Sequence, residues 1–229
     1  MQVPSLPMGD LVDLGCGDGM ALAALKSRFP KRRVLGVDFS PAKLARARGY
    51  DALVQAVAAL WVPEQPPALI FSNAALHWLG DHETLLPRLA ALLLPGGVLA
   101  VQMPRQSLAP SHALLRELAA EIFPDRFDFA GFRPPVDNPG SYWQMLEPLG
   151  EVTLWETENL LHLDPVAEGH PVRACTETTA MRPFLELLTP VEARNFTARY
   201  DAALASPYPL RPDGSTLFPF RRLFLTLRV

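Results

Sequence analysis

Three glycines and two acids follow an apolar segment near the start of the chain, in the stretch Leu11 to Gly19, LVDLGCGDG. Glycines let backbone approach a ligand, whereas Asp13 and Asp18 would repel a pyrophosphate and attract a cation. Met20 replaces the last glycine of a dinucleotide fingerprint, and no Walker-type lysine follows. We therefore predict an adenosine-like, positively charged ligand, a description that S-adenosylmethionine meets with its sulfonium and ammonium groups.

Of two other interpretations of this stretch, one stays open and one does not fit. A glycine-rich turn that only packs a helix on a strand stays open as an alternative. A nicotinamide-dependent dehydrogenase does not fit, because the last glycine is missing and Asp18 places a carboxylate beside the loop.

Length and composition favour one α/β domain with insertions that binds a small molecule. The chain has 229 residues, which is too few for two full domains. Its net charge of -3 would not attract negatively charged nucleic acid or an anionic membrane surface. Its longest apolar run, Leu89 to Leu94, predicts neither a spanning helix nor a signal peptide. Cys16 and Cys175 lack metal-ligand spacing, so we expect no metal and a cytoplasmic protein.

Strand and helix signals alternate in the first hundred residues, which predicts a mostly parallel sheet with helices on both faces. Strands are expected at residues 11–15, 32–38, 51–57, 68–74, 97–103 and 151–157, with a last strand at 216–229. Helices are expected at residues 21–28, 82–94, 112–122 and 140–149, after Ser40-Pro41, and after a capping box at Thr189, with Ser40 and Asp81 as caps of the helices that follow them.

Two stretches rich in proline, at about 104–136 and 159–215, interrupt this pattern. We interpret the chain as a single Rossmann-like domain of residues 1–229 in which these stretches form a cap. Ligands of open parallel sheets bind beyond the carboxyl ends of the strands, where both stretches begin. The glycine loop, the insertions and the pair Arg221-Arg222 are therefore expected at one edge of the sheet.

The sequence resembles the trans-aconitate 2-methyltransferases, a family of class I S-adenosylmethionine-dependent enzymes. The resemblance rests on the segments VDLGCGDG, FSNAALHWLGDH, LLPGGVLAVQMP, APSHALLRELA, VTLWET, AMRPFLELL and PFRRLF, and it covers nearly the whole chain from Leu11 onward. It implies a sheet that is mostly parallel with an antiparallel last strand, and methyl transfer from S-adenosylmethionine to a carboxylate of trans-aconitate. A carboxylate is already a nucleophile at neutral pH, so we expect positioning and no catalytic base.

The resemblance implies a set of cofactor-binding residues around the glycine loop and the strand ends. Asp13 matches an acid near the amino-acid end of the cofactor, and Asp38 matches the acid that binds both ribose hydroxyls. The predicted set is Asp13, Gly15, Cys16, Gly17, Gly19, Asp38, Phe39, Val57 and Asn73. For Asp38, a purely structural role as a cap for the helix after Ser40 stays open.

Substrate contacts are expected after the fourth strand, at the end of the fifth and near the C-terminus. The candidates are His77, Trp78, Gln102, Arg182, Tyr208, Arg221 and Arg222. Arginine is the better clamp for a carboxylate, although Arg221 and Arg222 would face opposite ways in a strand. His77 in the wall, Trp78 in the core and exposed arginines without a role are the structural alternatives. We expect His82, His112, His162 and His170 at the surface or as caps.

The chain departs from the family in two places. Val57 stands where the family has an aspartate that accepts the adenine amino group, and only twelve residues precede Asp13, where the family has a longer helical segment. Two alternatives to a trans-aconitate methyltransferase stay open. One is a methyltransferase for another acid, such as a malonyl group on a carrier, and the other is a non-catalytic binding module with an impaired cofactor site.

Overall fold

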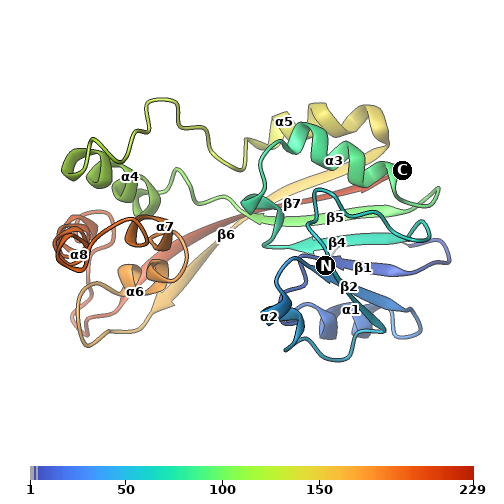
Figure 1. The fold of residues 1–229 in the computed structure, drawn as a ribbon, viewed down its shortest axis with the longest axis horizontal. Helices are drawn as coiled ribbons and strands as arrows, with labels where there is room; N and C mark the ends of the chain where they lie inside the picture. The colour runs from blue at the N-terminus through green and yellow to red at the C-terminus, as the bar shows by residue number, and fades with distance from the viewer. Residues whose placement is uncertain (1–2, 4) are drawn as a thin grey trace. The chain divides into compact units, whose positions relative to one another are not determined.

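The computed structural model describes residue 3 and residues 5–229, and its contacts divide the chain into two compact units (Figure 1). The first unit comprises Met1–Pro104, Pro135–Thr157 and Arg222–Val229. The second comprises Arg105–Pro134 and Glu158–Arg221, two segments that overlap the predicted insertions. That the second unit acts as a cap stays a prediction.

Seven strands form one sheet in the order β3-β2-β1-β4-β5-β7-β6. They are β1 (Leu11–Leu14), β2 (Val34–Asp38), β3 (Ala52–Gln55), β4 (Leu69–Asn73), β5 (Val98–Pro104), β6 (Glu151–Leu163) and β7 (Thr216–Arg228). The strands from β3 to β5 are parallel, and β7 runs antiparallel to β5 with Val98 opposite Arg228. The predicted fold class, with its antiparallel last strand, is confirmed.

Several helices of the first unit begin at residues whose side chains accept a backbone N–H. Ser40 receives the N–H of Lys43, and Asp81 receives that of Thr84. These helices are α1 (Leu22–Arg28), α2 (Pro41–Leu44), α3 (His82–Ala91), α5 (Pro139–Leu146) and the 3-10 turns η1 (Leu76–Trp78) and η2 (Glu147–Leu149). The sequence predicted both caps, because a short polar side chain satisfies an N–H that a helix leaves unpaired.

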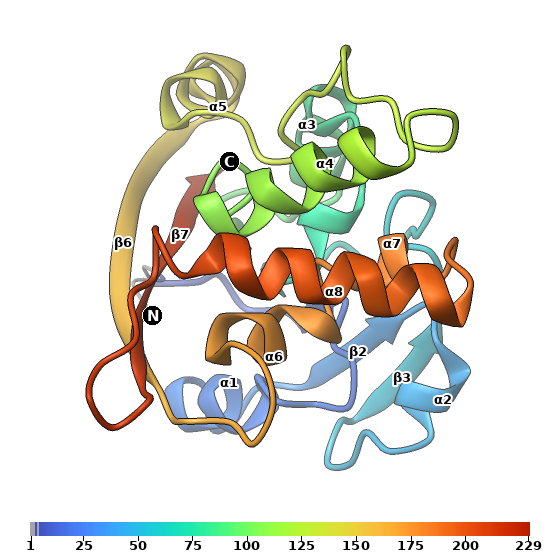
Figure 2. The same ribbon diagram turned by 90° about the vertical axis from the view of Figure 1, so that its left-hand side faces the viewer.

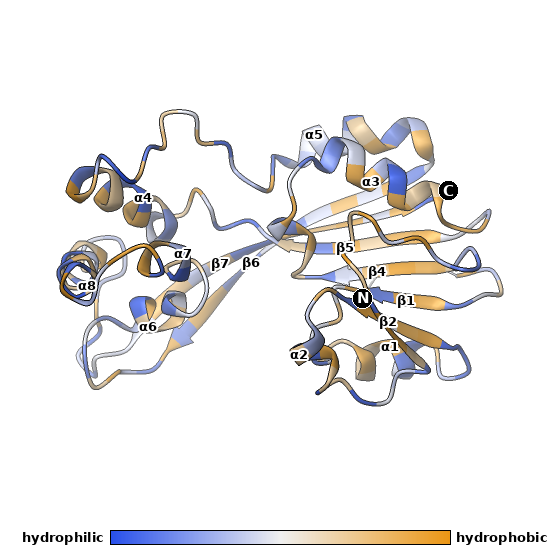
Figure 3. Ribbon diagram, viewed as in Figure 1, coloured by the Kyte–Doolittle hydropathy of each residue, from blue (hydrophilic) through white to orange (hydrophobic). Residues whose placement is uncertain are grey.

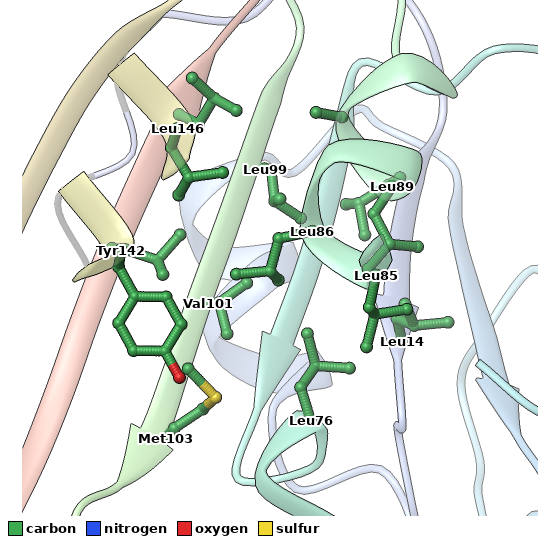
Figure 4. Close-up of a cluster of buried hydrophobic side chains, with 14 of the residues drawn as sticks. Leu14, Leu76, Leu85, Leu86, Leu89, Leu99, Val101, Met103, Tyr142 and Leu146 are labelled. Atoms are coloured by element: carbon green, nitrogen blue, oxygen red, sulfur yellow. The ribbon is translucent and has the colours of Figure 1, made fainter. Parts of the chain in front are cut away.

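Two apolar cores lie on opposite faces of the parallel strands. On one face, Leu86 of α3 and Tyr142 of α5 pack with Val101 and Met103 of β5, as Figure 4 shows. On the other face, Leu25 of α1 belongs to a smaller core to which the strands contribute alternate residues. Because both faces are covered, β4 and β5 are apolar along most of their length (Figure 3).

The second unit has its own core, built mainly from helices (Figure 2). Its helices are α4 (Pro110–Ile122), α6 (Pro171–Glu177), α7 (Arg182–Leu185) and α8 (Pro190–Leu204). Phe196 and Tyr200 of α8 are fully buried there together with Leu115 and Ala119 of α4. The predicted capping box is present, because Thr189 and Glu192 exchange side-chain to backbone hydrogen bonds. No helix in the described part of the chain is long and apolar enough to cross a membrane.

Three sequence-based expectations need correction. Strand β6 continues to Leu163, beyond the predicted end at residue 157, because it is an edge strand whose polar residues can face water. Helices α6 and α7 were not predicted, since their short polar sequences carry no clear period. His82 is buried, although we expected it at the surface or as a cap.

Candidate functional site

Four polar residues share one face of the sheet at the carboxyl ends of neighbouring strands. The alternation within each strand fixes this face, because Leu11, Val34, Leu69 and Val98 all belong to the core under α1. The residues at the strand ends on the same face are Asp38 of β2, Asp13 of β1, Asn73 of β4 and Gln102 of β5. The sequence predicted all four as ligand-binding, and the fold places them along one edge.

The glycine loop after β1 needs its glycines for two different reasons. Gly15, Gly17 and Gly19 have φ angles of 78°, 58° and 100°, in the region that L side chains rarely adopt. A Cβ atom on Gly15 would lie 2.2 Å from the Cβ of Ala75, whereas one on Gly17 would meet nothing closer than 3.9 Å. Gly15 therefore lets the loop after β4 pack closely, and Gly17 leaves backbone open to a ligand.

The Asp38 carboxylate connects the glycine loop to the end of β2 by hydrogen bonds. It is 5% exposed, and its Oδ2 accepts the N–H of Gly17 at 2.9 Å while Oδ1 accepts the N–H of Ser40 at 2.9 Å. Each carboxylate oxygen can accept a second hydrogen bond, so Asp38 can also bind vicinal hydroxyl groups. Its contact with Ser40 agrees with the structural alternative as well, and the two roles do not exclude each other.

Asp13 is a buried acid with a single side-chain partner. Its Oδ2 accepts the hydroxyl of Tyr50 at 2.6 Å, and burial raises the pKa of this carboxyl to about 6 despite that hydrogen bond. Cys16 beside it stays a thiol, because burial and then the charges of Asp13 and Asp38 raise its pKa to about 12. Cys16 is therefore no nucleophile.

The residues around the glycine loop fit a cationic adenosine derivative. Neither Asp13 nor Asp38 forms an ion pair with a residue that the structure describes, so two acids face this edge without a counter-charge. Phe39 and Val57, which adjoin the ends of β2 and β3, are 68% and 47% exposed. A ligand with a cationic group and an apolar ring system would satisfy both features.

The loop between β4 and η1 is strained and fixed from behind. Ala74 has a φ of 51°, a conformation that costs a non-glycine residue about 1 kcal/mol. His82 holds the following turn, because its Nε2 hydrogen-bonds the carbonyl of Leu76 at 3.0 Å and its Nδ1 hydrogen-bonds the hydroxyl of Tyr142 at 2.7 Å. Strain that surrounding contacts maintain is typical of ligand-binding loops.

His77 and Trp78 lie in this turn and differ in how far they are exposed to solvent. Trp78 is 64% exposed, which contradicts the structural alternative of a core residue, and its ring centroid lies 4.9 Å from that of His77. His77 is partly buried, and this burial lowers its pKa to about 4, with the neighbouring His82 adding to the effect. Its Nδ1 is buried without a hydrogen-bond partner, so His77 is a neutral ring with one polar atom unused.

Gln102 is the other buried side chain of this edge with unused polar atoms. It is 4% exposed, and neither Nε2 nor Oε1 has a hydrogen-bond partner. A buried polar group without a partner costs about 1–3 kcal/mol, so few native side chains are left in this state. Asn73, which pairs with Gln102 in the register of β4 and β5, is exposed, so this face of the sheet is accessible to solvent one strand away.

The remaining predicted substrate contacts are arginines and one tyrosine. In the second unit, Arg182 pairs with Glu186 at 2.7 Å and Arg221 pairs with Glu158 at 3.0 Å, and both arginines are exposed. Arg222 belongs to the first unit, is partly buried and already interacts with other residues.

Tyr208 is 4% exposed in the core of the second unit, where its hydroxyl accepts the N–H of Ser111 at 3.1 Å. Its predicted contact with the substrate, like those of the arginines, stays a prediction.

Sequence reasoning missed two residues, one in each unit. Tyr50 follows Gly49 in a turn, and no sequence signal connects it with Asp13, 37 residues earlier. Arg116 lies one helical turn after His112 in α4, is partly buried, and stacks 3.8 Å above the ring of Phe132 without a carboxylate partner in the described chain. Only its position within the resembling segment APSHALLRELA could have drawn attention to it.

Comparisons with known proteins identify the family of the chain. The sequence profile of a methyltransferase-domain family matches residues 5–162. The chain is 37% identical to a trans-aconitate 2-methyltransferase of Paracidovorax citrulli, over 99% of this chain and 89% of the relative. It is 42% identical to a protein of the same name from Escherichia coli O1:K1, over 95% of this chain and 85% of the relative.

Solved structures resemble the fold at low sequence identity. The YcgJ protein of Bacillus subtilis aligns with a TM-score of 0.58 at 13% identity, over 96% of this chain and 91% of that protein. A phosphoethanolamine N-methyltransferase 2 of Haemonchus contortus, solved with S-adenosyl-L-methionine, aligns with a TM-score of 0.52 at 16% identity, over 96% of this chain and 49% of its own. These likenesses concern the fold.

Proposed function

Because the chain belongs to the trans-aconitate 2-methyltransferase family, we propose that it transfers a methyl group from S-adenosylmethionine to one carboxylate of a small polycarboxylic acid, with trans-aconitate as the first candidate. The observation that carries this proposal is the identity of 37% to 42% with relatives of that name over nearly the whole chain. The unpaired acids beside the glycine loop support it, since the cofactor is a cation.

We assign cofactor binding to the glycine loop and the ends of β1 and β2. Asp38 would bind ribose hydroxyls, Asp13 would face the amino-acid end, and Gly17 would admit the ligand to the backbone. Cys16, Phe39, Val57 and Asn73 border this part of the edge and complete the predicted set. Val57 is the weak member, because valine cannot accept a hydrogen bond from an adenine amino group.

The reaction needs no acid or base from the protein. S-adenosylmethionine, when bound, supplies the methyl group: a carboxylate oxygen bonds to the methyl carbon, and the electron pair of the broken carbon–sulfur bond stays on sulfur. No proton moves, so the chain contributes orientation, worth about 7–11 kcal/mol at best, and exclusion of water. His77, with a pKa of about 4, is neutral at pH 7 and fits such a site.

Carboxylates that are not methylated need cationic partners, and arginine is the side chain suited to them. Arg182, Arg221 and Arg222 remain candidates, although a ligand would have to displace Glu186 or Glu158 from the first two. Arg116 joins them as a candidate because its guanidinium group has no carboxylate partner in the described chain. Tyr208 would act as a hydrogen-bond donor through the proton that it does not use for Ser111.

We expect the reaction in a reducing compartment such as the cytoplasm, because Cys16 and Cys175 are both free thiols. The net charge of -3 gives no attraction to nucleic acid or to an anionic membrane, so we propose a free small molecule as the substrate.

Two measurements on the purified protein test the proposed function. Calorimetric titration with S-adenosylhomocysteine should give a micromolar Kd, because product binds such a site without turnover. Transfer of a labelled methyl group should then be measured with acids that carry one, two or three carboxylates. We expect the highest kcat/KM for a tricarboxylate.

Each alternative has its own outcome in these measurements. Activity only with a malonyl group on a carrier, or only with a monocarboxylate, would replace the substrate class. Absence of heat and of a thermal shift at millimolar S-adenosylhomocysteine would identify a non-catalytic binding module, and the proposed function would be wrong.

A further inference from the structure

Two buried glutamines near the end of β5 have the same burial and opposite hydrogen bonding. Gln106 is 5% exposed, and its amide is paired at both ends: Nε2 donates to the carbonyl of Pro219 at 2.9 Å, and Oε1 accepts the N–H of Arg221 at 3.0 Å. Gln102 is 4% exposed and paired at neither end. Hydrogen bonds explain why glutamine stands at position 106, but they do not explain it at position 102.

The place of Gln102 along the sheet edge indicates what its amide is for. The acids assigned to the cofactor end β2 and β1, and the next strands on the side away from β2 are β4 and β5. Asp13 lines up with Phe71 of β4 and, through it, with Ala100 of β5, so Gln102 lies two strands away and two residues further along, roughly 12 Å from Asp13 on the same face. A ligand that follows the cofactor along this edge would meet β4 and then β5.

We propose that the side-chain amide of Gln102 binds the carboxylate that accepts the methyl group, and that its lack of charge keeps this carboxylate reactive. This inference rests on the proposed function and names the residue that positions the reacting group. An N–H of Nε2 would donate to one carboxylate oxygen and leave the other oxygen free to attack.

The charge balance of the reaction explains why a neutral donor suits this position. The attacking oxygen gives an electron pair to the methyl carbon, the carbon–sulfur pair returns to sulfur, and a carboxylate anion and a sulfonium cation become an ester and a thioether. Negative charge on the carboxylate therefore falls as the bond forms. A cation would bind the charged substrate more strongly than the less charged transition state and would therefore slow the step. A neutral amide loses little binding energy between the two states.

His77, in the turn beside β5, is a second uncharged polar side chain in this region. The 3-10 helix η1 that contains it packs beside β5, and the Nδ1 atom of His77 is also buried without a partner. The edge at β4 and β5 thus offers two uncharged polar side chains, in contrast to the two acids at β1 and β2.

The test compares Gln102→Met with Gln106→Met in the full chain. Methionine keeps the length of the side chain and removes the amide. For Gln102→Met we expect kcat/KM for the polycarboxylate to fall about 10- to 100-fold, an unchanged Kd for S-adenosylhomocysteine, and an equal or higher Tm. Gln106→Met should lower the Tm, because the carbonyl of Pro219 and the N–H of Arg221 lose their partners.

A second variant separates hydrogen bonding from packing. Gln102→Glu keeps the shape and replaces the donor with a carboxylate that repels the substrate, so its kcat/KM should fall below that of Gln102→Met. A Gln102→Met protein with wild-type kcat/KM, or with a Tm lowered as much as in Gln106→Met, would overturn the inference. A wild type that binds S-adenosylhomocysteine but methylates none of the acids would instead contradict the proposed function.

Discussion

The Asp13 carboxyl group is 1% exposed and has no cation beside it in the described structure. Burial raises its pKa from 3.8 to about 6, so the folded protein holds a proton there that the unfolded chain has released between about pH 4 and 6. Stability therefore falls as the pH rises through this window, by about 3 kcal/mol for a shift of about two units. A cationic ligand would reverse part of this loss.

Asp13→Asn should separate stability from binding. Asparagine keeps an acceptor for Tyr50 and removes the buried charge, so the free energy of unfolding at pH 8 should rise by up to about 3 kcal/mol. Urea denaturation between pH 4 and 8 checks this, and the variant should lose the fall in stability between pH 4 and 6. Its Kd for S-adenosylmethionine should increase. A variant less stable than the wild type at pH 8 would contradict the assigned role of burial.

Val57→Asp should strengthen the cofactor site. The side chain at position 57 is 47% exposed, so an aspartate can be accommodated there without burying a charge. One added hydrogen bond of about 1 kcal/mol tightens binding about five- to tenfold. Calorimetry with S-adenosylhomocysteine measures the change, and Leu60→Asp, at an exposed position three residues on, is the control. Equal effects of the two variants would mean that position 57 does not contact the adenine.

Arg116→Gln tests the guanidinium group that has no carboxylate partner. If it binds a spare carboxylate, KM for the polycarboxylate should rise about 10- to 100-fold with little change in kcat, because the lost contact is the same in the substrate and in the transition state. Arg133→Gln, which changes an exposed arginine of the same unit, is the matched control. An unchanged KM would remove Arg116 from the candidates.

At the scale of single elements, helix α8 depends on its N-terminal box. Thr189 accepts the N–H of Glu192 and donates its hydroxyl to the Glu192 carboxylate at 2.9 Å. Hydrogen bonds from Arg126 and then from Thr189 hold the pKa of Glu192 at about 2, so the box stays charged at neutral pH. Helix α8 in turn supplies Phe196 and Tyr200 to the core of the second unit.

Thr189→Ala should therefore destabilise the second unit by about 1 kcal/mol, because an N-terminal N–H loses its acceptor. Chemical denaturation followed by circular dichroism measures the loss. Val191→Ala, which changes an exposed residue of the same turn, should cost much less. If both variants are equally stable, the box contributes nothing beyond helix propensity.

At the scale of the whole molecule, the chain consists of two compact units with separate cores. The residues assigned to the cofactor lie in the first unit, where the glycine loop joins β1 to α1 and Asp38 ends β2. Binding free energy should therefore first stabilise the first unit.

Hydrogen exchange with and without S-adenosylhomocysteine tests this expectation. At a ligand concentration of 100 times Kd the bound state gains about 2.7 kcal/mol, so amides of β1, β2 and α1 should exchange more slowly. Amides of α8 should change less. The opposite pattern, with protection confined to α8, would place the cofactor in the second unit and contradict the assignment.

The sequence by itself determined the order of the elements and the residues at their ends. Alternating apolar strands, caps at Ser40, Asp81 and Thr189, and the glycine loop are local signals, because they depend on neighbours within a few residues. They were sufficient for the parallel sheet and the glycine loop, whereas the family resemblance supplied the antiparallel last strand and most of the predicted ligand residues at one edge.

Only the tertiary structure decided which polar groups are paired, because partners far apart in sequence leave no local pattern. It brought Tyr50 into a hydrogen bond with Asp13 and paired Arg182 and Arg221 with glutamates. Arg116 has no carboxylate partner in the described chain. It also distinguished Gln102 from Gln106, two glutamines four residues apart, by giving hydrogen-bond partners to one of them. Burial makes this difference matter, since an unpaired amide costs free energy only where water cannot reach it.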